Sequence, residues 1–202
     1  KTVMKTFNKF SLIFLLMVFS PISQADLKSD FQQAHLSFLA YIDEAGSSFD
    51  QAWDLFEKLD ANYPDHPAVQ VYFGSMETLK ARNAWMPWTK MKWVEQGLDR
   101  IDRALSLLKP EHQRQFLIAT PIALDTQISA ASTFLAVPSF LNRLQDGKDM
   151  FAEIQQSTDV SALHPELQWR IYLIGKSIAE QEDNETAIHS WQTKIDELKI
   201  NP

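Results

Sequence analysis

The chain is punctuated from end to end by residues that start and stop helices, and this punctuation constrains the fold more than any other feature. Ser48 opens a capping-box pattern, and Asn184 can cap a following helix. Pro67, Pro110 and Pro165 suit first helical positions, where the missing N–H costs nothing. Strand-like alternation is absent over any useful length. The sequence therefore predicts an all-α fold with helices at 27–45, 49–63, 67–83, 89–108, 111–132, 138–156, 166–181 and 184–199.

Small residues recur at a spacing that suits close contact between paired helices. Near the C-terminus, Gly175 is followed by Ala187 and then, four residues on, by Trp191. Upstream, Phe56 follows Ala52 by four residues, and Gly74 follows Ala52 by twenty-two, the spacing expected across a junction between two helix pairs. Two further second-helix patterns are Gly97, Ile101, Ala104 and Gly147, Phe151, Ile154. Four of the five glycines thus fall at expected interhelical contacts.

This spacing resembles the tetratricopeptide repeat (TPR), a helix pair of about 34 residues with a small residue at each helix crossing. The resemblance implies TPR-like antiparallel helical-hairpin repeats that form a short α-solenoid of about three and a half hairpins with a concave face. On this interpretation, residues 26–202 are one TPR-like helical repeat domain. An irregular helical bundle remains the alternative.

Residues from about 70 to 145 also resemble a narrower group of uncharacterised bacterial secreted or periplasmic proteins with TPR-like repeats. The resemblance rests on the segments Tyr72-Phe73-Gly74, Leu79-Lys80-Ala81-Arg82, Pro87-Trp88-Thr89-Lys90-Met91-Lys92, Gly97-Leu98 and Pro138-Ser139-Phe140-Leu141, and on Asp102 with Ala104. No assigned activity comes with this group, so the resemblance supports the architecture only.

The first twenty-five residues are typical of a secretory signal peptide. They contain Lys1, Lys5 and Lys9 and no acid, then an apolar run over 10–19, then small residues before a cleavage point after Ala25. The alternative, an uncleaved anchor, fits less well because the run is about half of the roughly 20 residues that a spanning helix needs. We therefore expect residues 1–25 to be removed, a periplasmic or secreted location, and no stable membrane insertion afterwards.

Composition excludes several classes of protein. The chain has no cysteine, so disulfides and cysteine-ligated metals are ruled out. Its net charge is −7, and because residues 1–25 contribute three lysines and no acid, the remainder carries −10. That acidic balance argues against nucleic acid and against general attraction to anionic lipid.

The segment from Lys80 to Trp93 is the candidate binding site, because it gathers half of the tryptophans beside cations in an acidic chain. Such residues dominate many binding interfaces. The candidate partner-binding residues are Arg82, Trp85, Trp88, Lys90, Lys92 and Trp93. The alternative is that these tryptophans fill the gap left by a lengthened connection between a first and a second helix.

No catalytic, cofactor or metal site is predicted. The five histidines lie far apart in sequence, and His66 and His164 precede prolines at helix starts, which favours capping or surface roles. Asp102 attracts interest as a buried acid that would need a partner such as Arg82 or Arg114. There is no Gly-x-Ser-x-Gly turn and no phosphate-binding loop.

The sequence thus favours a non-catalytic periplasmic scaffold or adaptor that binds a protein or peptide partner of unknown identity. The alternative is a small-molecule or peptide binder, or an accessory subunit of an envelope enzyme or transporter, that uses the Trp/Lys-rich segment. Oligomeric state is left open.

Overall fold

The structure is a computed structural model, and it describes residues 24–42 and 48–198. The predicted all-α fold is confirmed in this part of the chain, which contains eight α-helices. They are α1 (Gln24–Ile42), α2 (Phe49–Asn62), α3 (Pro67–Asn83), α4 (Pro87–Ser106), α5 (Ile122–Ala136), α6 (Leu144–Ser157), α7 (Pro165–Gln181) and α8 (Glu185–Glu197). Short 3-10 helices η1 (Pro110–Gln113), η2 (Ser139–Leu141) and η3 (Val160–Ala162) lie between them. The predicted signal peptide, residues 1–25, lies outside the described residues except for the first two positions of α1.

Helix ends follow the predicted chemistry at most positions. The Ser48 hydroxyl accepts a hydrogen bond from the Gln51 N–H at 3.1 Å, and the Asn184 side chain accepts one from the Ala187 N–H at 3.1 Å. Pro67 and Pro165 each begin a helix, as expected. These caps satisfy N–H groups that have no partner inside the helix.

The predicted helix at 111–132 is wrong in its first half. Pro110 starts only the 3-10 helix η1, and α5 begins at Ile122. Pro121 explains the break, because proline cannot donate an N–H and disfavours helical backbone at the residue before it. An isolated antiparallel bridge joins Phe116 to Pro121 instead. The next predicted helix also starts late, since Asn142 adopts a left-handed conformation that ends η2 before α6 begins.

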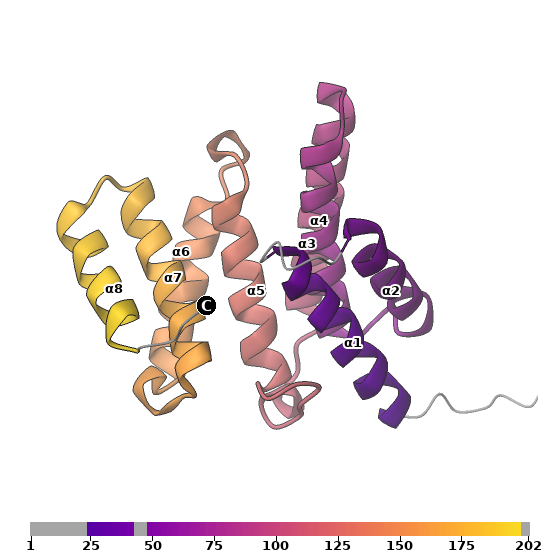
Figure 1. The fold of residues 1–202 in the computed structure, drawn as a ribbon, viewed down its shortest axis with the longest axis horizontal. Helices are drawn as coiled ribbons and strands as arrows, with labels where there is room; N and C mark the ends of the chain where they lie inside the picture. Colours follow the sequence, from indigo (N-terminus) through magenta and orange to yellow (C-terminus); the bar gives the residue numbers. More distant parts are fainter. Residues whose placement is uncertain (1–23, 43–47, 199–202) are drawn as a thin grey trace, which may run out of the picture.

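Each helix packs against its neighbour in the chain, as the pairs α1–α2, α3–α4, α5–α6 and α7–α8. The pairs follow one another along the long axis of the molecule in chain order (Figure 1). Helices α3 and α4 approach most closely at Gly74 and Gly97, where a Cβ on Gly97 would lie 2.5 Å from the Gly74 carbonyl oxygen. Gly147 meets Leu135, and Gly175 meets Trp191. The predicted interhelical contacts of these four glycines are therefore confirmed.

Two hydrophobic clusters share helix α5. The first joins α1 to α4 and is rich in aromatic rings, such as Phe31, Phe56 and Tyr72. The second joins α5, α6 and α7 through mostly aliphatic side chains, such as Ile128, Ile154 and Ile171. Helix α5 contributes to both because its side chains are buried around most of its circumference. It therefore connects the two halves of the fold.

A buried charged cluster links α2, α3 and α4 through hydrogen bonds and ion pairs. Glu77, which is 1% exposed, accepts hydrogen bonds from Arg100 and Gln96 on both of its carboxylate oxygens. Arg100 also donates to Asp60 and Gln70, each at 2.9 Å. Burial raises the pKa of Glu77, and the contact with Arg100 opposes that rise. We call these five residues the α3–α4 cluster. Every member has a partner, as a buried polar network requires.

Candidate functional site

Three adjoining cavities lie on the side of the molecule formed by the first helices of the pairs, α1, α3, α5 and α7. An apolar cavity of about 510 Å³ lies between α3, α4 and the end of α5. A central cavity of about 430 Å³ lies between α1, α3 and α5. A third cavity, of about 380 Å³, is lined in part by His35, and we call it the His35 cavity. The first two share Thr78, Leu79, Arg82 and Ala136, and the last two share Leu39 and Arg170. We call the three together the groove.

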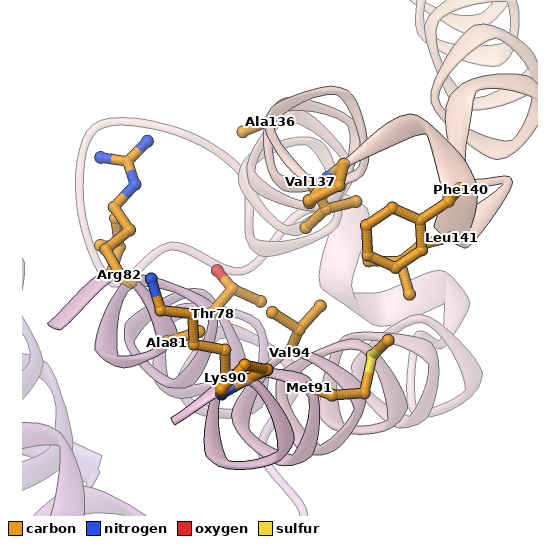
Figure 2. A pocket seen from close by; sticks show the side chains of 13 residues that line it. Thr78, Ala81, Arg82, Lys90, Met91, Val94, Ala136, Val137, Phe140 and Leu141 are labelled. Carbon is orange, nitrogen blue, oxygen red and sulfur yellow. The ribbon is translucent and has the colours of Figure 1, made fainter. Parts of the chain in front are cut away.

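The apolar cavity has two unlike sides. Figure 2 shows Met91, Phe140 and Leu141 on one side, and the cationic side chains of Arg82 and Lys90 on the other. Val94 and Thr78 lie between them. Among the described residues, none that lines the apolar or the central cavity is acidic. A ligand here would meet apolar surface and positive charge together.

Tyr72, Ser129 and Arg170 line the central cavity, and they belong to a polar cluster of side chains from α3, α5 and α7. Asp125, which is 2% exposed, accepts hydrogen bonds from the Tyr72 hydroxyl at 3.1 Å and from Arg170 Nη1 at 2.9 Å. Arg170 Nη2 also donates to the Ser129 hydroxyl at 3.3 Å. Arg170 lines both the central and the His35 cavities, so the ion pair borders the groove. Together with His35 of α1, these residues are called the groove cluster.

Burial governs the electrostatics of the groove cluster. It raises the pKa of Tyr72, and the Asp125 carboxylate adds to that effect. For Arg170, burial favours the neutral form, but Tyr72 and Asp125 outweigh it and raise the pKa of the guanidinium. Tyr72 therefore stays a neutral donor and Arg170 stays a cation across the physiological range.

His35 is the member of the groove cluster with an unmet hydrogen bond. Its ring packs edge-on to Tyr72, with centroids 5.2 Å apart, and its buried Nε2 has no hydrogen-bond partner. Burial lowers the pKa of His35, the Arg170 cation lowers it further, and Asp125 opposes both. The imidazole is therefore neutral near pH 7 and leaves one polar atom for a ligand or water to satisfy.

The Ser129 hydroxyl is not placed as an activated nucleophile. A serine nucleophile needs a base that accepts its proton, but the Ser129 hydroxyl accepts from the Arg170 cation. In the part of the chain that the structure describes, no group of three or more His, Asp or Glu side chains is placed to hold a metal ion. The groove thus offers a cation, hydroxyl groups and an apolar wall.

The six predicted site residues lie in different surroundings. Arg82 and Lys90 line the apolar cavity. Trp85 and Trp88 are 90% and 69% exposed, and they lie outside the three cavities. Lys92 is exposed on α4. The sequence thus identified the region where α3 ends and α4 begins. The six predicted residues do not form one continuous site there.

Trp93 belongs to the packing of the fold. Its ring meets Trp53 edge-on, with centroids 5.7 Å apart. The Lys80 ammonium lies over both rings, 3.6 Å from the Trp53 centroid and 4.2 Å from that of Trp93. The half-buried Trp93 therefore joins α4 to α2 across the end of α3, which is the gap-filling role considered above for these tryptophans.

The groove cluster was not anticipated from the sequence, although one signal pointed to it. Asp125 is the sole charged residue between Gln115 and Leu141. An isolated acid in an apolar run must be paired if it is buried. Its partner, Arg170, is 45 positions away in the chain and carries no local signal of its role.

Asp102 and the histidines lie elsewhere. Asp102 is exposed and pairs with Arg143, so it is not the buried acid considered above and is not paired with Arg82 or Arg114. His164 caps α7 through a bond from the Glu166 N–H at 3.4 Å. His66 makes no side-chain cap, and its ring lies 6.3 Å from that of His112.

No family model, no curated protein and no solved structure matches this chain. None of the described helices is both long and apolar enough to cross a membrane. The function must therefore be argued from the groove itself.

Proposed function

We propose that this chain is a non-catalytic scaffold or adaptor that holds a segment of a partner protein in the groove. The observation that carries the proposal is the row of adjoining cavities along α1, α3, α5 and α7. Each of these helices is the first of its pair, so successive pairs all contribute to one surface. An extended or helical peptide can lie along such a surface and use several shallow pockets in turn.

The TPR-like solenoid is part of this proposal. It is supported by the packing of each helix on its chain neighbour and by the close contacts of Gly74 with Gly97 and of Gly175 with Trp191. Contribution of every first helix to the groove supports it as well. In repeat proteins the stacking of successive units creates an extended concave binding surface.

The lining of the groove defines the chemistry of the partner segment. Arg82, Lys90 and Arg170 provide positive charge, while Val94 and Phe140 provide apolar surface. The partner segment we propose carries a bulky apolar side chain for the apolar cavity and a carboxylate within reach of Arg82. An acidic segment also suits long-range attraction to this one cationic area of an acidic chain.

The location proposed for this activity is the periplasm or the outside of the cell. It rests on the signal-peptide pattern of residues 1–25. Mass spectrometry of the protein recovered from periplasm or medium should give an N-terminus at Asp26. Recovery of the full chain from cytoplasm alone would refute the proposed export.

Selection from a displayed random-peptide library tests the proposed function. With the wild-type protein as bait, the selected peptides should share an apolar residue near Asp or Glu. A Val94→Glu bait should lose them, because it introduces a carboxylate into the apolar cavity. A Phe116→Ala bait should keep them, since this exposed ring lies outside the groove. Failure to enrich any consensus, or enrichment unaffected by Val94→Glu, would refute the proposal.

A small apolar ligand is the second candidate, because the apolar cavity has the volume and lining of small-molecule sites. An apolar fluorescent dye tests it. Saturable dye binding that is lost in Val94→Glu, with no selected peptide able to displace the dye, would favour a small-molecule binder over a scaffold.

A further inference from the structure

Exposed apolar side chains gather at one end of the molecule, beside the apolar cavity of the groove. Of the seven large hydrophobic side chains that are exposed among the described residues, four lie at this end: Trp85 (90%), Trp88 (69%), Phe140 (65%) and Met86 (42%). Three of them come directly after the end of α3, namely Trp85, Met86 and Trp88. Phe140 lies in η2. The α3–α4 connection reaches the top of Figure 1, with the α5–α6 connection lower beside it. We call this end the tryptophan tip.

The backbone explains why these rings project. Gly74 and Gly97 let α3 and α4 pack so closely that the two helices form a narrow hairpin. Its connection is short, since α3 ends at Asn83 and α4 begins at Pro87. The residues of the connection adopt extended backbone at Ala84 and Met86. No helix of the described chain packs over this connection, so Trp85 and Trp88 remain in solvent.

The tip is also cationic, in contrast to the rest of the chain. No acid occurs between Thr78 and Val94, or between Thr126 and Leu144, although the whole chain carries −7. Arg82, Lys90 and Lys92 are exposed, and they form no ion pair with any described residue. Positive charge on flexible side chains therefore surrounds the exposed rings.

We propose that the tryptophan tip docks on the surface of an anionic lipid bilayer. Tryptophan favours the boundary between headgroups and acyl chains, where its ring is buried and its N–H stays hydrated. The lysine and arginine side chains extend to the phosphate layer while their methylene stems cover apolar surface. Each cation near an anionic surface contributes about a five-fold gain in affinity.

A lipid surface fits this end better than a protein partner does. Trp85 and Trp88 project into solvent and line none of the three cavities, although Pro87 and Phe140 beside them line the apolar cavity. A projecting end suits a soft, deformable surface that closes around it. The chain as a whole is acidic and is repelled by an anionic surface, so approach through the cationic tip is favoured. The tip shares Arg82, Lys90 and Phe140 with the apolar cavity, but Trp85 and Trp88 lie outside the groove, so vesicle binding through these rings is tested separately from the proposed function.

Quenching of tryptophan fluorescence by brominated lipids tests the proposal on the full chain. The chain has no tryptophan before Trp53, so the apolar N-terminal segment has no tryptophan emission of its own. Vesicles of brominated phosphatidylcholine with phosphatidylglycerol should quench the emission at low salt. Vesicles without phosphatidylglycerol, or 0.5 M salt (on the order of a few ångströms of Debye length), should not. The Trp85→Ala/Trp88→Ala variant should lose the quenching.

Two further variants complete the test. Lys90→Gln/Lys92→Gln should weaken the apparent vesicle affinity by roughly twenty-fold, because two cations are lost. Phe116→Ala changes an exposed aromatic residue outside the tip, so it should leave the apparent vesicle affinity unchanged. Circular dichroism confirms that each variant is folded. Absence of quenching with anionic vesicles overturns the proposal, and so does undiminished quenching in the folded double-tryptophan variant.

Discussion

Helix α3 contributes Glu77 to the α3–α4 cluster and Tyr72 to the groove cluster. The two clusters differ in how completely their buried polar atoms are hydrogen-bonded. In the α3–α4 cluster, Glu77 has donors on both oxygens, and Arg100 contacts three acceptors. In the groove cluster, Asp125 pairs with Arg170, but the buried Nε2 of His35 has no partner. The first cluster lies between helices, whereas the second borders the groove. A satisfied cluster holds helices together, and an incompletely satisfied one beside a cavity is available to a ligand.

The largest expected effect comes from Arg100→Ala. It leaves Glu77 buried without its cation, which should cost about 3–5 kcal/mol of unfolding free energy. Urea denaturation measures this loss. Arg103→Ala is the matched control: it removes an exposed ion pair with Asp65 and should cost less than about 1 kcal/mol. Similar losses of unfolding free energy in the two variants would show that the α3–α4 cluster does not stabilise the packing of these helices.

Arg170→Ala should have a smaller effect, about 1–3 kcal/mol. Asp125 loses its cation, but Tyr72 still donates to it and water from the adjoining cavities can replace the guanidinium. The same urea experiment compares this variant with Arg100→Ala. A loss of unfolding free energy as large as that of Arg100→Ala would mean that both clusters mainly stabilise helix packing. The groove cluster would then not differ from the α3–α4 cluster in this respect.

Tyr72→Phe should cost about 1 kcal/mol, since one hydrogen bond to Asp125 is removed while the aromatic packing stays. Thermal unfolding, read by circular dichroism, gives the difference. A destabilisation above about 3 kcal/mol would show that the hydroxyl is essential to the groove cluster, and that Arg170 alone cannot stabilise the buried carboxylate.

The smallest effect, measured between pH 7.5 and 5.5, concerns His35. Its folded-state pKa is lowered by burial, so protonation favours the unfolded chain. Stability from this group is present above pH 6.5 and is lost as the pH falls below that value. His35→Phe should make the dependence of unfolding free energy on pH shallower. An unchanged slope would show that His35 is as easily protonated in the fold as in the unfolded chain.

His66 provides the control for that slope, because it titrates outside the groove. Burial, with a contribution from His112, lowers the pKa of His66 to about 4. Its contribution to stability should therefore be lost between pH 6.5 and 4. His66→Gln should remove this acid sensitivity and leave peptide binding in the groove unaffected.

Local chemistry predicted most helices because their ends carry their own signals. Ser48, Asn184 and Pro165 act within one turn, so no knowledge of the fold was needed. The failure at 111–121 has a local cause as well: Pro121 was treated as part of a helix that it interrupts. The glycine spacing succeeded because only a residue without a Cβ fits where Gly74 faces Gly97.

The candidate site was harder to predict because it depends on residues distant in the chain. Arg82 and Lys90 could be identified as unusual by their neighbours in sequence, but the cavity beside them needs Val137 and Phe140 from another pair of helices. The pairing of Trp93 with Trp53 and of Asp125 with Arg170 depends likewise on how the pairs pack. Composition cannot distinguish the exposed Trp88 from the half-buried Trp93.

Chemical-shift mapping of the isotopically labelled protein with a selected peptide tests the central claim, that the groove binds a partner segment. The account predicts shifts concentrated on residues that line the groove, including Thr78, Val94, Ser129 and Ala136, with little change at Phe116 or along α8. Shifts confined to α8 or to the outer faces of α2 and α6, with the groove residues unchanged, would contradict it.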